Sequence, residues 1–184
     1  MIHFIQSNAS TIVGVLTLMS NIVFVGVIVT IILHAGSRAK LYAFVHKYIL
    51  ELLFWGVMSA VVGSLIYSNI IGFPPCDLCW YQRIFMYPQA IILFVAMRRK
   101  DKGIIDYLVP LSIIGAIIAL YQSFAQWGFS VGSIAGCAAV GAECAKVYVR
   151  EFSYITIPFM SFCVFIYIIV LKFIYYSHNK KLTL

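Results

Sequence analysis

Two cysteines separated by two residues, Cys76 and Cys79, stand between two long apolar segments of the chain. Thiols at this spacing can close into a small, exchangeable disulfide, and the unpaired backbone N–H groups at a helix start favour the thiolate form. Arg83 follows Cys79 by one helical turn, which would place both side chains on the same helix face. The pattern therefore predicts a redox-active thiol pair at a membrane boundary.

Three further cysteines fall into two different settings. Cys137 and Cys144 share a later loop whose first part is rich in glycine and serine and therefore flexible, so we expect both to move. The end of this loop, 143–152, is compatible with a short surface helix or with an irregular structure. Cys163 lies inside the last apolar segment, where we expect it to pack as a small buried hydrophobe. Because disulfides persist outside the cytoplasm, both loop pairs are candidate bridges.

Other uses of the cysteines can be weighed from their neighbours. Covalent haem attachment would need a histidine directly after Cys79, and Trp80 stands there. A zinc site built from both pairs is a second alternative, although the six residues between Cys137 and Cys144 exceed the usual spacing of about two to four. Two purely structural disulfides are a third alternative. The four histidines lie in the termini and the first connector, so we expect no histidine-based metal centre.

The composition is that of an integral membrane protein. Of the 184 residues, 63% are hydrophobic and 10% are charged, whereas soluble proteins have about 45–50% apolar and about 25% charged residues. Five stretches have about the 20 apolar residues that a membrane-spanning helix needs. They are 11–34, 48–70, 80–97, 104–124 and 154–176. We therefore predict an all-α, polytopic membrane helix bundle, in which Gly56, Ala60 and Ser64 let a neighbouring helix approach closely.

The positive charges predict the orientation in the membrane, since short loops rich in Lys and Arg stay in the cytoplasm. The first connector, the third connector and the C-terminal tail carry clustered basic residues, and the net charge is +7. The N-terminus and the two cysteine loops have no such excess. We therefore expect the N-terminus and the redox cysteines on the outer face and the C-terminus in the cytoplasm. Because no basic stripe remains, we expect no nucleic-acid partner.

The residues around the first thiol pair resemble those of a known family. The segment Pro75-Cys76-Asp77-Leu78-Cys79-Trp80-Tyr81-Gln82-Arg83-Ile84, followed by Met86-Tyr87-Pro88, is similar to the signature of the DsbB/BdbC family of membrane thiol oxidases. The residues Ile155-Thr156-Ile157-Pro158 after the second pair extend the resemblance. It implies a DsbB-like four-helix redox core over 48–176. One extra transmembrane helix and a basic cytoplasmic connector in 1–47 would precede this core, and a cytoplasmic tail, 177–184, would follow it.

The resemblance also implies a reaction. Members of this family reoxidise an exported thioredoxin-fold protein of the DsbA type and pass its electrons to a membrane quinone, ubiquinone or menaquinone, at the outer face of the bacterial cytoplasmic (inner) membrane. Cys137 and Cys144 would accept the electrons first, with the partner thiolate attacking Cys137, and would pass them to Cys76 and Cys79. Cys79 would face the quinone, and Arg83 would stabilise the Cys79 thiolate or a quinone oxygen.

Two further pairs of side chains are candidates for contacts near the site. Trp80 and Tyr81 would border the quinone ring by stacking, or they belong to the aromatic belt at the membrane boundary. Gln122 and Gln126 are candidate polar contacts, although a glutamine between helices also serves packing hydrogen bonds. The alternative function is that of a structural or zinc-bearing membrane protein whose outer cysteines are not catalytic.

Overall fold

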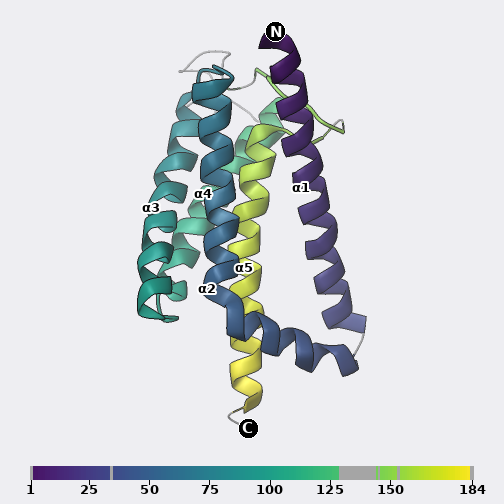
Figure 1. Ribbon diagram of the computed structural model, residues 1–184, viewed down its shortest axis with the longest axis vertical. Helices are drawn as coiled ribbons and strands as arrows, with labels where there is room; N and C mark the ends of the chain where they lie inside the picture. The colour runs from purple at the N-terminus through teal and green to yellow at the C-terminus, as the bar shows by residue number, and fades with distance from the viewer. Residues whose placement is uncertain (1, 34, 129–143, 145, 153, 183–184) are drawn as a thin grey trace.

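The computed structural model is a bundle of long helices (Figure 1), and it describes residues 2–33, 35–128, 144, 146–152 and 154–182. The elements in chain order are α1 (Ile2–Leu33), α2 (Ala35–Leu65), the π-helical turn η1 (Ile66–Ile70), α3 (Asp77–Arg99), α4 (Ile105–Gln126) and α5 (Ile157–Leu182). Within these residues the β-type pairing is limited to one antiparallel bridge between Glu151 and Ile155. The predicted helical membrane bundle is therefore confirmed.

Four helices in the described part of the chain are long and apolar enough to cross a membrane. Their spans are Thr11–Ile31, Lys40–Ile70, Ile105–Gln126 and Ile157–Ser177. α3, which contains the predicted span 80–97, has 23 residues and is about 34 Å long at about 1.5 Å per residue. It is long enough to cross, but it is more polar, since it carries Gln82, Arg83 and Gln89. Two of these, Gln82 and Gln89, are buried inside the bundle.

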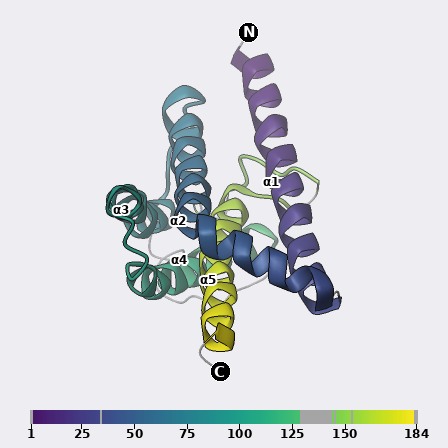
Figure 2. The same ribbon diagram turned by 60° about the horizontal axis from the view of Figure 1, so that its bottom comes forward.

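The first connector is helical, which differs from the sequence-based expectation. Residues 35–47 form the first part of α2 and run across the end of the bundle from α1 (Figure 1 and Figure 2). The helix then bends at Tyr48, whose backbone is non-helical (φ −110°, ψ 20°). The Ala, Leu, Lys and Arg residues of this part favour helix formation, so a segment recognised by its charge need not be a loop.

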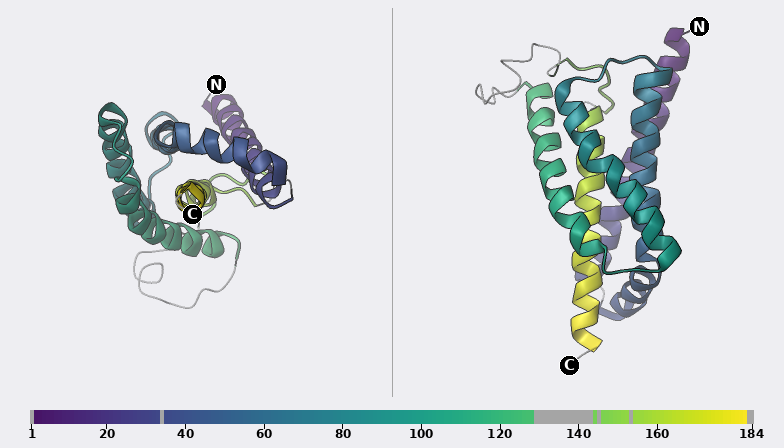
Figure 3. Two further views of the ribbon diagram at one scale, coloured as in Figure 1. Left: turned by 90° about the horizontal axis from the view of Figure 1, so that it is seen from below. Right: turned by 90° about the vertical axis from the view of Figure 1, so that its left-hand side faces the viewer.

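The connectors and the chain termini are divided between the two ends of the bundle (Figure 3). At one end, which we call the cysteine end, the chain passes from η1 to α3 and from α4 to α5, and the N-terminus lies at this end too. The opposite end, which we call the basic end, holds the C-terminus and the connector that follows Arg98 and Arg99. There the Lys102 Nζ donates a hydrogen bond to the backbone oxygen of His46 at 2.6 Å, which ties this connector to α2.

α4 and α5 pack closely because of a glycine. A Cβ atom at Gly115 of α4 would collide with the ring of Phe165 in α5, which is fully buried. Apolar side chains of α2, α3 and α4 complete this core, among them Ile49, Leu53, Val57, Leu93 and Leu108. Because lipid tails are as apolar as these side chains, such contacts stabilise the bundle mainly by van der Waals packing.

Two glycines of α2, Gly56 in the predicted small-residue stripe and the nearby Gly63, do not pack against a helix. An added Cβ at Gly56 or Gly63 would meet no atom within 4 Å. The prediction of close helix approach is therefore wrong at these positions, which line open spaces shared with α1. Small residues allow close approach but do not enforce it, and the rings of Phe24 and Tyr167, with centroids 4.2 Å apart, lie between α1 and α5.

Candidate redox site

Cys76 and Cys79 lie at the start of α3, at the cysteine end. Cys76 is the N-cap residue, with an extended backbone (φ −75°, ψ 171°), and Cys79 is in the first turn. The preceding Pro74 and Pro75 favour an extended chain, so the helix begins at the thiols themselves. The two Sγ atoms are 3.3 Å apart, with Cys76 donating to Cys79. The pair is therefore in direct contact, and a small adjustment would allow a disulfide.

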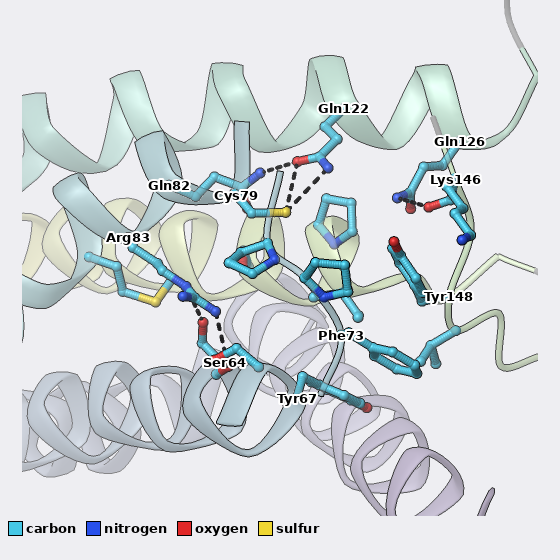
Figure 4. Close-up of a pocket in the computed structure, with 18 residues that line it drawn as sticks. Ser64, Tyr67, Phe73, Cys79, Gln82, Arg83, Gln122, Gln126, Lys146 and Tyr148 are labelled. Carbon is cyan, nitrogen blue, oxygen red and sulfur yellow. Dashed lines mark hydrogen bonds between the residues drawn. The ribbon is translucent and has the colours of Figure 1, made fainter. Parts of the chain in front are cut away.

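The side-chain amide of Gln122, in α4, contacts both thiols. Its Nε2 donates to the Sγ of Cys76 at 3.2 Å and to that of Cys79 at 3.4 Å. Its Oε1 accepts a hydrogen bond from Gln82 Nε2 at 2.7 Å (Figure 4), which turns the amide nitrogen toward the cysteines. Both glutamines are buried. The amide pair is therefore a fixed polar contact between α3, α4 and the thiols.

Cys144 lies in the same cluster. It is 1% exposed, its backbone oxygen is 3.5 Å from the Nε2 of Gln122, and its side chain is within hydrogen-bonding reach of Cys76. In this arrangement Cys144 packs against the first thiol pair, and the mobility that the loop composition predicts stays a prediction. Cys137 lies outside the described residues. Three of the four predicted redox cysteines are thus brought together.

The end of α4 holds the segment 146–152, which follows Cys144. The Gln126 Nε2 donates to the backbone oxygen of Lys146 at 3.2 Å. In return, Arg150 donates to the backbone oxygen of Gln126 at 2.6 Å. The segment forms no helix, so of the two predicted alternatives the described residues adopt the irregular loop.

The hydrogen bonds make the first two thiols unequal. The bond from Cys76 lowers the pKa of Cys79 most strongly, burial opposes this effect, and the Gln122 amide lowers the pKa further. The same bond raises the pKa of Cys76, and burial raises it further. Cys79 lies ahead of the predicted span 80–97, at the outer end of α3. The lowered pKa favours the thiolate form of Cys79 and makes it the better leaving group of the two in disulfide exchange.

Arg83 and Cys79 border one cavity between α2, α3, α4 and α5, which we call the redox cavity (Figure 4). It has about 720 Å³ of empty space, counted with its open mouth. The Arg83 Nε donates to Ser64 Oγ at 2.9 Å, and its Nη2 donates to the backbone oxygen of Ser64 at 3.2 Å. The guanidinium is therefore anchored on the α2 side of the cavity, while the Cys79 sulfur faces Gln122 on the α4 side.

Two residues that line the redox cavity each have a buried polar atom with no hydrogen-bond partner within the described residues. These atoms are the hydroxyl of Tyr67 and the Oε1 of Gln126, and the two residues are 5% and 8% exposed. An unpaired buried polar group costs about 1–3 kcal/mol, so a ligand that bonded to these atoms would relieve that cost. Met86 and Ile157 supply apolar walls. An apolar cavity with a few convergent polar groups is typical of a small-molecule site.

Trp80 and Tyr81 do not line the redox cavity. They are 52% and 51% exposed, and the Trp80 ring lies 5.1 Å from the guanidinium carbon of Arg83. This position suits the aromatic belt, and stacking on a quinone ring stays a prediction for both residues. Cys163 is buried in α5 and does not line the redox cavity either.

Gln82 and Ser64 are site residues that the sequence analysis does not assign. Gln82 follows Cys79 by three residues, so a glutamine on the thiol-bearing face of an apolar helix is a usable signal. For Ser64 the small-residue stripe predicts only packing, and no local pattern shows that it accepts hydrogen bonds from Arg83. Gln122 is a candidate polar contact by its sequence, and the structure shows it at the cysteines.

Comparisons with known proteins show the family of the chain. The family model described as Disulfide bond formation protein DsbB matches residues 46–175, which leaves out α1 and the first part of α2. Probable disulfide formation protein C 2 of Bacillus anthracis is 41% identical over 137 residues, which cover 74% of this chain and 96% of that protein. No solved structure shows a significant match.

Two other relatives have similar names. Disulfide bond formation protein C of Bacillus subtilis is 41% identical over 111 residues, which cover 60% of this chain and 80% of that protein. Probable disulfide formation protein of Coxiella burnetii is 35% identical over 124 residues, which cover 67% of this chain and 84% of that protein. The family match spans more than half of the chain, and it includes the Cys76–Cys79 signature. The chain therefore belongs to the DsbB family of membrane proteins for disulfide bond formation.

Proposed function

We propose that the protein is a thiol:quinone oxidoreductase, which reoxidises an exported DsbA-type thioredoxin-fold protein and passes the electrons to a membrane quinone. The observation that carries this proposal is the meeting of Cys76, Cys79 and Cys144 at Gln122, beside the redox cavity. Exchange between two cysteine pairs requires that a thiolate reach the sulfur it attacks. Cys76, Cys79, Cys137 and Cys144 are the proposed catalytic residues.

Electrons enter through the second pair. The partner's thiolate attacks the Sγ of Cys137 in a Cys137–Cys144 disulfide, so a mixed disulfide forms and Cys144 leaves as a thiolate. The partner's second thiolate then breaks the mixed disulfide, which releases Cys137 and leaves the partner oxidised. Two electrons have now moved from the partner to the second pair, and the protons follow as the thiolates are neutralised.

The second pair passes these electrons to the first. The Cys144 thiolate attacks Cys76 of a Cys76–Cys79 disulfide, so a Cys76–Cys144 bond forms and Cys79 leaves as a thiolate. Cys137 then attacks Cys144, which restores the second disulfide and frees Cys76. The contact between the Cys144 and Cys76 side chains supports this order. The lowered pKa of Cys79 supports it too, because a thiol of lower pKa leaves faster.

A quinone would supply a lipid-soluble acceptor of two electrons and two protons. The residues of the redox cavity fit such a group: Arg83 and the unpaired Tyr67 hydroxyl can donate to carbonyl oxygens, and the unpaired Gln126 Oε1 can accept from a hydroxyl. Arg83, held by Ser64, would stabilise negative charge that develops on an oxygen. Ubiquinone and menaquinone both carry the ring oxygens that this set of groups requires.

We further propose that the cysteine end faces outward from a bacterial cytoplasmic membrane. The clustered basic residues lie at the opposite end, and such clusters stay in the cytoplasm. In this orientation the thiols meet exported proteins on the side where disulfides persist. The redox core would be 48–176, with an added helix and connector in 1–47 and a cytoplasmic tail in 177–184.

Quinone reduction by the purified protein tests this function. The protein in lipid nanodiscs is mixed with a reduced thioredoxin-fold donor and with ubiquinone or menaquinone analogues, and quinol formation is followed by absorbance. We expect donor-dependent turnover in the unaltered protein and in Cys163→Ala, and none in a folded Cys79→Ser variant. A protein with purely structural disulfides or zinc would form no quinol in any variant, and Cys79→Ser would lower its stability or its zinc content.

A further inference from the structure

α1 lies outside the family match and contacts the bundle at separate points (Figure 1). Near the cysteine end, Gly14 lies against Glu151, since an added Cβ there would be 2.7 Å from the Cγ of Glu151. Further along α1, Ser20 donates to the Tyr167 hydroxyl at 3.3 Å, and Tyr167 donates to Asn21. These contacts hold α1 beside α5 while leaving space on either side of Tyr167.

Two neighbouring cavities, one on either side of Tyr167, occupy this space between α1, α2 and α5, and we call them together the α1 groove. The outer cavity has about 1050 Å³ and the inner one about 1150 Å³ of empty space, each counted with its open side. Ser20, Val164 and Tyr167 line both. α1 presents one helix face to the groove, with Val13, Thr17, Ser20, Phe24 and Val27. Gly56 and Gly63 of α2 also line it and leave it unobstructed.

The α1 groove adjoins the redox cavity. Ser64, Tyr67, Ile157 and Ser161 line both the redox cavity and the outer cavity of the groove. Ser64 is also the residue that anchors the Arg83 guanidinium. A ligand with its polar ring beside Arg83 would therefore find an apolar path that leads past Ser64 toward the middle of the bilayer.

We propose that the α1 groove holds the polyprenyl chain of the quinone, with α1 as the outer wall of the channel. This inference rests on the proposed function, since it extends the site of the same acceptor. A polyprenyl chain is long and apolar and carries its one polar group at the end, and the groove is apolar with its polar end at the redox cavity. A phospholipid acyl chain has the same polarity, so the experiments below distinguish it from the polyprenyl chain.

Chain-length dependence of quinone reduction tests the groove. Gly63→Leu fills the outer cavity, and leucine favours the helix more than glycine does. We expect this variant to raise the ratio of KM for a long-chain quinone to KM for a chainless analogue by about tenfold. Ile117→Phe adds volume on an exposed face of α4 that lines neither cavity, and it should leave the ratio unchanged. An unchanged ratio in Gly63→Leu would overturn the inference.

Photocrosslinking supplies a readout that does not depend on turnover. A quinone analogue with a diazirine near the end of its chain is bound to the unaltered protein in nanodiscs, and the labelled residues are mapped by mass spectrometry. Labels on the groove face of α1 and on α2 between Gly56 and Gly63 are expected. Labels from a diazirine phospholipid at these residues that excess quinone does not displace would show an acyl chain instead. If no quinone is reduced at all, the proposed function fails, whereas reduction without groove labelling defeats this inference alone.

Discussion

Replacing Gln122 by leucine removes the amide that contacts both thiols and keeps a side chain of similar size. The Gln122 Nε2 lies 3.2 Å from the sulfur of Cys76 and 3.4 Å from that of Cys79. A hydrogen bond to a charged group contributes about 1.5–3 kcal/mol, and about 1.4 kcal/mol corresponds to one pKa unit. Because the amide is shared between two sulfurs, we expect the lower part of this range, so the pKa of Cys79 should rise by about one unit.

The pH dependence of alkylation measures this shift. Reduced protein is labelled with iodoacetamide over a pH series, and the rate at Cys79 is followed by mass spectrometry of the peptide that contains it. Only the thiolate reacts, so the rate rises as the pH rises through the pKa of Cys79. In Gln122→Leu the profile should move to higher pH, and at a pH below both pKa values Cys79 should react about tenfold more slowly than in the unaltered protein.

Gln89→Leu is the matched control. Gln89 is a fully buried glutamine of α3, whose Nε2 donates to the Phe85 oxygen at 2.9 Å and whose Oε1 accepts from Ser112 at 3.1 Å. The Gln89→Leu variant loses similar buried hydrogen bonds, but none to a cysteine. The pH profile of Cys79 alkylation should therefore be the same in this variant as in the unaltered protein. An unmoved profile in a folded Gln122→Leu variant would refute the assigned role of the amide. An equal shift in Gln89→Leu would show that general loosening of the bundle causes the effect.

Three other changes have definite expected results. Arg83→Ala should raise the quinone KM by about tenfold, because a charged hydrogen-bond donor is lost. The KM for the reduced partner should change by less than about twofold. An equal quinone KM in the variant and the unaltered protein, measured by steady-state kinetics, would count against this role of Arg83. Cys163→Ala should keep full turnover and lower stability by at most about 1 kcal/mol, and a large loss of partner oxidation would show that this thiol is a redox group. Gly115→Leu should lower the unfolding free energy by about 1–3 kcal/mol or more by overpacking against Phe165. Gly56→Leu should not lower it, because an added Cβ there meets no atom within 4 Å. Equal denaturation midpoints for the two variants would contradict the packing described.

The helices could be predicted from the sequence because a bilayer demands long apolar runs. The runs 104–124 and 154–176 begin within a few residues of α4 and α5. Helix ends were less predictable, since polar residues continue a helix beyond the membrane: α5 extends to Leu182, and α2 begins at Ala35 in a segment marked only by charge.

The local part of the candidate site could be predicted as well, because Cys76, Cys79 and Arg83 belong to one short motif. The contact of Cys144 with that motif and the bond between Gln82 and Gln122 depend on how α3 packs on α4, which no local pattern contains. The hydrogen bonds of Arg83 to Ser64 in α2 also depend on helix packing, because the spacing of Arg83 predicts only its helix face. Its long side chain then reaches across to α2.

Single-turnover oxidation of the reduced protein tests the central claim most directly, because it needs no partner. Fully reduced Cys163→Ala protein is mixed with quinone in the absence of oxygen, and quinol and remaining thiols are measured over time. We predict one quinol for each pair of thiols lost, with a Cys76–Cys79 disulfide as the first product, and no quinol from Cys79→Ser. Quinol formed at an undiminished rate by Cys79→Ser, or with both thiols still reduced, would contradict the account.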